Sequence, residues 1–270
     1  MPELPEVETI RRGLAPLICD AGIAGLTVRE RRLRWPVATR LSGIVKGKQI
    51  QAVSRRGKYL LFKLDEGCLI IHLGMSGSLR YLQEPQPPKK HDHYDIELDS
   101  GALVRYNDPR RFGSLHYTIA PEAHPLLCKL GPEPLGGEFT GEYLWRRSRD
   151  RKVGIKQLIM NGQIVVGVGN IYANEALHRA GIHPTRPAGR ISRSRIDRLC
   201  QEICAVLEDA LRSGGTTLRD FVGSDGRPGY FRQSLSVYER AGEACRRCGA
   251  TIRRRVIGQR ASYFCVGCQR

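Results

Sequence analysis

The chain has 270 residues, of which 41% are hydrophobic, so it can bury a core and form two or three modest domains. Its 44 Lys and Arg residues outnumber 27 Asp and Glu, which gives a formal net charge of +17. This surplus favours a polyanionic partner such as nucleic acid, although a binder of acidic lipid could share it. No stretch reaches the roughly 20 apolar residues that cross a bilayer, and the acidic N-terminus does not resemble a secretory signal. We therefore expect an intracellular protein with no membrane partner.

The first predicted element is a helix. Apolar residues recur at helical spacing from Val7 to Leu17, and Glu6 and Glu8 stand in the first turn, where the helix dipole favours acids. Removal of the initiator Met would leave Pro2 with a free secondary α-amine. An α-amine titrates near 7.7–8.0 in ordinary chains, about the pH at which a neutral nucleophile is useful. Taken alone, Pro2 is equally compatible with a simple helix start.

The next hundred residues have sequence patterns typical of β-strands. Short apolar or alternating runs stand at residues 59–62, 69–71 and 94–98. Residues 99–101 (DSG) have the composition of a hairpin turn into a further strand at 103–106. Short strands separated by turns predict an antiparallel sandwich or barrel.

Helical patterns follow a Pro/Gly-rich linker at residues 131–141. Residues 155–160 and a helix that begins at Asn170 are predicted first. A longer apolar stripe runs from Ile196 to Leu211, and Gly214 and Gly215 close it in the manner of a C-cap. The last 35 residues return to a strand-like pattern.

The C-terminal segment carries two C-x-x-C pairs, separated by 16 residues: Cys245 and Cys248, then Cys265 and Cys268. Two such turns facing each other supply the tetrahedral cage of four thiolates that zinc prefers, and a closed cage is structural. A redox motif or two disulfides are the alternatives. The five other cysteines (Cys19, Cys68, Cys128, Cys200 and Cys204) stand among apolar residues and are expected to be small core residues.

A β-hairpin is predicted between the two cysteine pairs, at residues 251–256 and 260–264, with its turn at Gly258 and Gln259. It carries four arginines: Arg253, Arg254, Arg255 and Arg260. Such a run is usually a solvated face. Here the arginines stand on a short element that needs its metal to fold, and this arrangement favours contact with a nucleic-acid phosphate or groove.

Several motifs follow one another along the whole chain: residues 2–9 (PELPEVET), 56–60 (RGKYL), 72–77 (HLGMSG), 107–113 (NDPRRFG), 166–175 (VGVGNIYANE), 224–231 (SDGRPGYF) and the cysteine pairs. In this order they resemble the formamidopyrimidine-DNA glycosylases, bacterial repair enzymes for 8-oxoguanine and ring-opened purines. The resemblance implies an α+β protein: an N-terminal antiparallel β-sandwich with an N-terminal helix, a helix–two-turns–helix domain and a zinc-ribbon hairpin. The expected ranges are 1–130, a linker at 131–150, then 151–230 and 231–270.

The resemblance also implies a chemistry, that of a bifunctional glycosylase and AP lyase of base excision repair. Pro2 would be the Schiff-base nucleophile and Glu3 the proton donor that assists base loss. Lys58 would donate a proton in β-elimination and Arg260 in δ-elimination. One structural Zn²⁺ and no organic cofactor are expected. Without the resemblance, Lys58 would be read as a surface cation at the start of a strand.

The implied partner is double-stranded DNA that contains an oxidised base. An enzyme that extrudes a base must offset the lost stacking, and Met75, Arg110 and Phe112 match the residues that fill the void. Met75 or Phe112 alone would be read as core packing. Further DNA contacts are expected from His91, Arg151, Lys156 and Asn170, the last because a helix N-terminus favours phosphate. A metal pair of His91 and His93 is the competing idea for those two residues.

Residues 217–231 resemble a loop that covers the extruded purine, with Arg219 where relatives are expected to carry Lys. Two rival functions stay open: an endonuclease-eight-like glycosylase for oxidised pyrimidines, and a non-catalytic zinc-ribbon DNA-binding protein. Leu4 and the complete set of Met75, Arg110 and Phe112 favour the purine enzyme over the first. Pro2, Glu3 and Lys58 favour an enzyme over the second. We expect a cytoplasmic, nucleoid-associated bacterial monomer.

Overall fold

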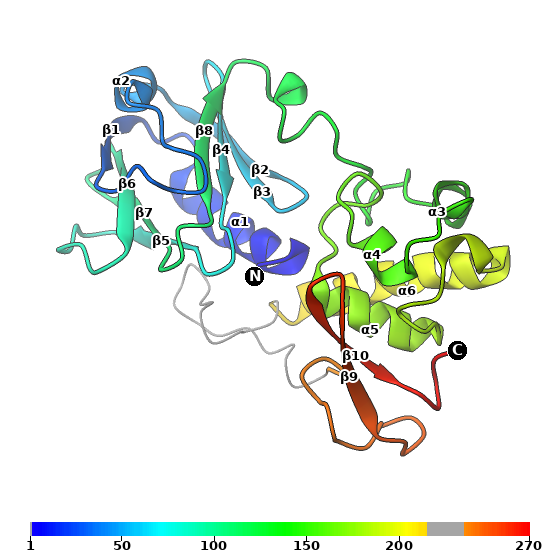
Figure 1. Cartoon of the computed structure of the whole chain (residues 1–270). Coiled ribbons are helices and arrows are strands. Elements are labelled where there is room, and N and C mark those ends of the chain that lie inside the picture. Colours follow the sequence, from blue (N-terminus) through cyan, green and yellow to red (C-terminus); the bar gives the residue numbers. More distant parts are fainter. Residues whose placement is uncertain (1, 215–234) are drawn as a thin grey trace. The chain divides into compact units, whose positions relative to one another are not determined.

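A computed structural model describes residues 2–214 and 235–270 of the chain. Met1 and the whole of the expected covering loop, residues 217–231 with Arg219, therefore lie outside the described residues. The described chain has a mixed α+β fold and divides into two compact units (Figure 1). The first holds residues 2–128; the second holds residues 129–212 and 235–270.

The first unit is built from two antiparallel sheets of four strands each, in the orders β1-β6-β7-β5 and β2-β3-β4-β8. Tyr94 and Tyr106, both fully buried, stack at 4.7 Å between ring centroids in its core. The elements are α1 (Leu4–Ile18), β1 (Ile23–Val28), α2 (Leu41–Val45), β2 (Ile50–Arg56), β3 (Tyr59–Leu64), β4 (Cys68–His72), β5 (Ser78–Leu82), β6 (Asp92–Leu98), β7 (Leu103–Asn107), β8 (Ser114–Thr118) and the 3-10 turn η1 (Pro121–Ala123).

Helix α1 belongs to the same core. Val7, Ile10 and Leu14 are almost completely buried and join the hydrophobic cluster formed by both sheets. The apolar stripe that predicts this helix is therefore the face that packs on the sandwich, except at its end, where Leu17 is 48% exposed. Burial of the stripe places the N-terminus of the chain against the sheets.

The second unit is helical with one hairpin. Helices α3 and α5 pack against the long helix α6, and α5 also packs against strand β10. Its elements are α3 (Gly141–Ser148), α4 (Ile155–Ile159), α5 (Asn170–Ala180), the 3-10 turn η2 (Ala188–Arg190), α6 (Arg193–Arg212), β9 (Ile252–Ile257) and β10 (Arg260–Cys265). The stripe from Ile196 to Leu207 is the buried face of α6.

The fold class expected from the sequence is confirmed, including the predicted strands, the helix that begins at Asn170 and the C-terminal hairpin. One expectation about cysteines is wrong: Cys128 is exposed, at the end of the first range of the first unit, beyond η1, and not in a core. Among the described helices, none is both long and apolar enough to cross a membrane.

Candidate functional site

The residues expected to carry the chemistry lie at the N-terminus of α1. Glu3 is the N-cap, and its side chain and that of Glu6 form a reciprocal capping box, with the Glu3 N–H donating to Glu6 Oε2 at 2.8 Å. Pro2 is buried, and Glu3 is only 1% exposed. The capping box therefore fixes the carboxyl group of Glu3, the residue that follows Pro2, at the N-terminus of α1.

A chain of polar contacts connects α1 to the turn that carries Lys58. Glu8 on α1 accepts a hydrogen bond from Arg55 Nε at 3.3 Å, and Arg55 Nη1 donates to the Gly57 carbonyl at 2.8 Å. Arg11 also binds Glu8 and lowers its pKa, although burial opposes this. Lys58 follows Gly57 in the turn between β2 and β3, so the helix that begins beside Pro2 is tied to the position of Lys58.

His72, at the end of β4, is a site residue for which the sequence analysis has no role. Burial and the nearby charges of Lys58 and Arg34 lower the pKa of His72 from 6.5 to about 4. The imidazole is therefore neutral at pH 7. Its Nδ1 accepts the N–H of Gly74 at 3.0 Å, which holds the start of the loop that carries Met75. The position of His72 directly before the Leu-Gly-Met motif is the sequence feature that could have indicated its place in the site.

Two neighbouring loops present the residues expected to enter the duplex. Met75 is partly exposed, whereas Arg110 and Phe112 are exposed, Phe112 to 42%. The guanidinium carbon of Arg110 lies 4.7 Å from the centre of the Phe112 ring. The loops touch: a Cβ on Gly74, whose φ is +69°, would lie 2.5 Å from the nitrogen of Gly113. The alternative of core packing is therefore wrong for Phe112.

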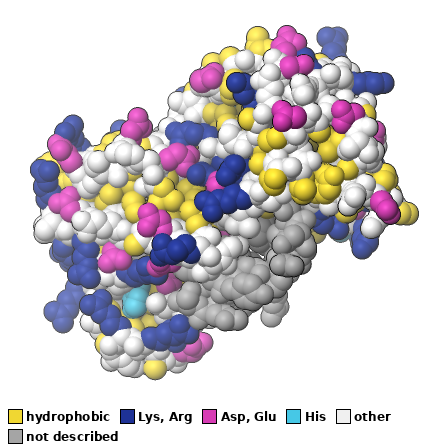
Figure 2. Space-filling view, turned by 180° about the vertical axis from the view of Figure 1, so that it is seen from behind, with side chains coloured by type: hydrophobic (Ala, Val, Ile, Leu, Met, Phe, Trp, Pro, Cys, Tyr) yellow, Lys and Arg dark blue, Asp and Glu magenta, His cyan; other side chains and the backbone are white. Residues whose placement is uncertain are grey.

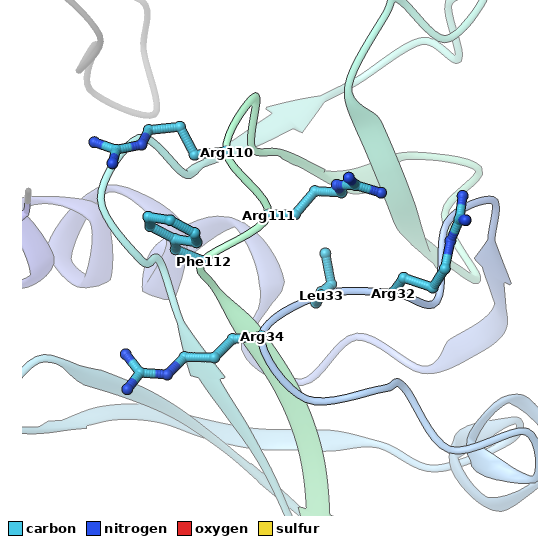
Figure 3. Close-up of a pocket in the computed structure, with 6 residues that line it drawn as sticks. All are labelled: Arg32, Leu33, Arg34, Arg110, Arg111 and Phe112. Atoms are coloured by element: carbon cyan, nitrogen blue, oxygen red, sulfur yellow. The ribbon is translucent and has the colours of Figure 1, made fainter.

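A cavity of about 610 Å³ opens beside these loops and is lined by Arg32, Leu33, Arg34, Arg110, Arg111 and Phe112. In Figure 3 the side chains of Arg34 and Arg110 extend to the same side as the Phe112 ring, whereas Arg32 and Arg111 extend to the other. The backbone of Arg34 is tied to the Phe112 loop, because its N–H donates to the Gly113 carbonyl at 3.1 Å. Arg34 is a second residue that the sequence analysis missed.

His91 and His93 do not form a shared metal site with a third ligand in the described chain. The rings are 6.3 Å apart between centroids, and His93 Nε2 is engaged with the Asp108 carbonyl at 2.7 Å. His91 adopts a positive φ of 72°, and its carbonyl accepts the N–H of Asp108. It is partly exposed, so its expected role as a DNA contact stays a prediction.

Lys156 has a different place from the one expected. It is only 1% exposed, and its Nζ donates to Asn170 Oδ1 at 2.6 Å, to Ser262 Oγ at 2.6 Å and to the Ala261 carbonyl at 3.2 Å. Asn170 Nδ2 donates to the same carbonyl at 3.0 Å. Three protein oxygens surround its ammonium group in this structure, and the expected phosphate contact of Lys156 stays a prediction. The residue ties Asn170, the first residue of α5, to the hairpin.

The cations of the hairpin are exposed on both of its faces. Arg260 is the first residue of β10 and pairs with Ile257 across the turn, in which Gly258 and Gln259 both have positive φ. Arg253, Arg254 and Arg255 on β9 are all exposed. Arg151, before α4, is also exposed. Figure 2 shows Lys and Arg side chains over much of the face it presents, with Asp and Glu among them.

Four cysteines gather at the open end of this hairpin. The sulfurs of Cys245, Cys248, Cys265 and Cys268 all lie within 4.8 Å of one another. Cys245 and Cys268 are 3.9 Å apart, and Cys248 and Cys265 are 3.3 Å apart. Four sulfurs at about 2.3 Å from a tetrahedral zinc stand roughly 3.8 Å apart, so the cluster fits one Zn²⁺ with no open position. His178 Nε2 lies 3.5 Å from the sulfur of Cys245.

Comparison with known proteins accounts for nearly the whole chain. Residues 1–115 match the formamidopyrimidine-DNA glycosylase N-terminal domain, residues 130–222 the H2TH domain of the same enzymes, and residues 242–270 the zinc finger found in FPG and IleRS. The chain belongs to the formamidopyrimidine-DNA glycosylase family. The zinc-finger match and the cluster of four cysteines together assign one structural Zn²⁺.

Curated relatives agree with this membership over full length. The formamidopyrimidine-DNA glycosylases of Alkalilimnicola ehrlichii and Stutzerimonas stutzeri are 57% and 55% identical, each covering 100% of both chains. Among solved structures, the MutM (Fpg) protein of Thermus thermophilus has a TM-score of 0.89 at 38% identity, covering 99% of this chain and 98% of that one. A mutant Lactococcus lactis Fpg, solved with DNA that contains Fapy-dG, has a TM-score of 0.93 at 35% identity over both full chains.

Proposed function

We propose that this family member excises oxidised purines, 8-oxoguanine and formamidopyrimidines, from double-stranded DNA and then cleaves the strand as an AP lyase. The observation that carries the proposal is the pair of touching loops that present Met75, Arg110 and Phe112 to solvent. An exposed apolar wedge with an arginine against its ring is suited to fill the space left by an extruded nucleotide. The Lactococcus relative that was solved with DNA containing Fapy-dG supports the substrate class.

The proposed chemistry begins at Pro2. Its amine, once Met1 is removed, attacks C1′ of the damaged nucleotide, and the base leaves with the bonding electrons and a proton that Glu3 supplies. The attacking nitrogen loses its proton, and its lone pair then displaces O4′: the C1′–O4′ bond breaks, O4′ takes up a proton, the sugar ring opens and an iminium ion forms. Loss of a proton from C2′ breaks the C3′–O3′ bond, with Lys58 as the proton donor, and a second elimination breaks C5′–O5′, with Arg260 as the donor. Support comes from the buried, capped position of Glu3 beside Pro2.

The DNA interface in this proposal is electrostatic. His91, Arg151, Arg260 and the arginines of the hairpin contact phosphates, and Arg110 faces the base left unpaired. Lys156 acts indirectly by holding Asn170. This assignment rests on the exposure of the arginines and on the three hydrogen bonds that Lys156 already makes.

Borohydride trapping tests the proposal. Protein whose mass confirms removal of Met1 is incubated with a duplex that contains one 8-oxoguanine opposite cytosine, and a covalent adduct is expected. A variant with an uncleaved N-terminal extension, in which the Pro2 nitrogen is an amide, is expected to give none. Adducts on an oxidised pyrimidine only would transfer the assignment to the endonuclease-eight type. Tight binding with no adduct on any lesion would make the chain a non-catalytic DNA-binding protein.

A further inference from the structure

Asp108 is a buried carboxylate at the point where two loops meet, one carrying Met75 and the other carrying Arg110 and Phe112. We call these the two wedge loops, and the three residues the wedge residues. It is 0% exposed and accepts four hydrogen bonds. Its Oδ1 accepts from the hydroxyl of Ser76 at 2.7 Å and from the Arg110 N–H at 3.2 Å. Its Oδ2 accepts from the hydroxyl of Tyr106 at 3.0 Å and from the Gly113 N–H at 2.9 Å. All four donors are uncharged groups, so the two loops and Tyr106 of β7 together solvate this carboxylate.

Three of the four donors belong to or directly follow wedge residues, and the fourth, the hydroxyl of Tyr106, belongs to β7. Ser76 directly follows Met75, Gly113 directly follows Phe112, and the Arg110 donor is the backbone of a wedge residue itself. One carboxylate therefore joins the Met75 loop to the Arg110–Phe112 loop. The backbone of Asp108 extends the connection, because its N–H donates to the carbonyl of His91 at 3.0 Å.

The space around this junction is closed. A Cβ on Gly77 would lie 2.1 Å from the Leu73 carbonyl, and one on Gly113 would lie 2.5 Å from the His72 carbonyl. The first contact lies within the Met75 loop and the second joins Gly113 to the end of β4, whereas Gly74 and Gly113 bring the backbones of the two loops together. The hydrogen bonds of Asp108 thus act on loops that are already in contact, and they select one arrangement of them.

We propose that Asp108 is a positioning residue that couples the Met75 loop to the Arg110–Phe112 loop, so that Met75, Arg110 and Phe112 enter the duplex as one unit. Asp108 does not touch the DNA and acts only through the residues beside its donors. The inference rests on the proposed function, because it concerns the step in which the wedge fills the space of the extruded base.

The test variant is Asp108→Asn. An amide replaces one of the two accepting oxygens with an N–H donor. The hydroxyls of Ser76 and Tyr106 can rotate, but in either orientation of the amide one backbone N–H, of Arg110 or of Gly113, loses its acceptor. The matched control is Asp95→Asn. Asp95 is a buried carboxylate of the same sheet that binds Arg29 and Arg105 and accepts no hydrogen bond from either wedge loop.

The measurement is fluorescence of 2-aminopurine placed opposite a tetrahydrofuran abasic analogue, which reports insertion of the wedge and needs no chemistry. A double-mutant cycle with Phe112→Ala isolates the coupling. We expect Asp108→Asn to slow the fluorescence change about tenfold in the wild-type background and less than twofold in the Phe112→Ala background. Asp95→Asn is expected to leave the rate within twofold of the wild type. Equal slowing by Asp108→Asn in both backgrounds would overturn the proposal.

A second variant guards against misfolding. Ser76→Ala removes only the hydroxyl donor on the Met75 side, and we expect it to slow the fluorescence change about threefold. If Ser76→Ala and Asp108→Asn both leave the insertion rate unchanged, the inference is wrong. The outcome is separable from the proposed function. Failure of the wild type to excise 8-oxoguanine would reject that function, whereas the fluorescence cycle on the abasic analogue still decides the role of Asp108.

Discussion

At the scale of single residues, the arginines that line the cavity beside Phe112 differ in their partners. Arg32 and Arg111 both pair with Glu30, at 2.7 and 3.4 Å. The guanidinium of Arg34 instead lies 4.8 Å from the centre of the Trp35 ring, and no carboxylate pairs with it in the part of the chain described. A charge that no acid neutralises is the better phosphate ligand.

We therefore predict unequal effects of two alanine variants. Arg34→Ala should weaken binding of duplex DNA and reduce the slope of log K against log salt by about one. Arg32→Ala, which removes an arginine paired with Glu30, should leave the slope unchanged. Fluorescence anisotropy at a series of salt concentrations measures both. Identical slopes for the two variants would contradict the distinction.

His72 carries a prediction about pH. Because its folded pKa of about 4 lies below the ordinary 6.5, the unfolded chain takes up the proton first as the pH falls. The contribution of His72 to stability is complete above pH 6.5, decreases as the pH drops toward 4, and is constant below. Urea unfolding of the wild type and of His72→Asn over this range should show a weaker pH dependence in the variant. An imidazole resonance of His72 that titrates near 6.5 would refute the prediction.

At the scale of elements, Lys156 connects helix α5 to the zinc hairpin. Lys156→Met preserves much of the volume but removes the ammonium donor of Asn170 Oδ1 and Ser262 Oγ, whereas the Ala261 carbonyl keeps the N–H of Asn170. Each buried acceptor that loses its donor costs roughly 1–3 kcal/mol. We predict that the free energy of unfolding of the second unit falls by about 3 kcal/mol. The exposed Lys152 supplies the control, Lys152→Met, which should be nearly neutral. Denaturant titration of both variants makes the comparison.

The hairpin itself has too small a core to be stable alone. Its buried cluster comprises Val237, Cys245, Ile252 and Cys265, two of which are cysteines of the metal cluster. We predict that removal of zinc exposes the hairpin amides to hydrogen exchange and abolishes DNA binding, and that added zinc restores both. Full DNA binding by protein shown by metal analysis to be zinc-free would disprove this.

At the scale of the whole molecule, the formal charge of +17 sets the salt response. Neutralisation of several phosphates releases counterions, so the affinity for undamaged duplex should decrease about a thousandfold or more between 50 and 200 mM salt if six or more phosphates are contacted. Nitrocellulose filter binding measures this. An affinity that is nearly independent of salt would exclude the proposed interface.

The sequence predicted local features of this molecule better than the contacts between residues that are far apart along the chain. The hairpin turn at Gly258, the start of α5 at Asn170 and the cysteine cluster follow from short patterns. The burial of Lys156 does not, because two of its three acceptors, Ala261 and Ser262, lie more than 100 residues further along the chain. A lysine in a short helix has the pattern of a surface cation until that long-range pairing is known.

The capping box at the start of α1 separates the integrity of the fold from the competence of the enzyme. The helix is capped by Glu3 and Glu6, and the cap makes no use of the nitrogen of Pro2. A preparation with Met1 still attached should therefore give the same circular dichroism, the same melting temperature and the same zinc content as the processed protein, while lacking the free amine that we propose as the nucleophile. Measurement of the intact mass therefore shows whether Met1 has been removed and whether a sample carries the free amine of Pro2.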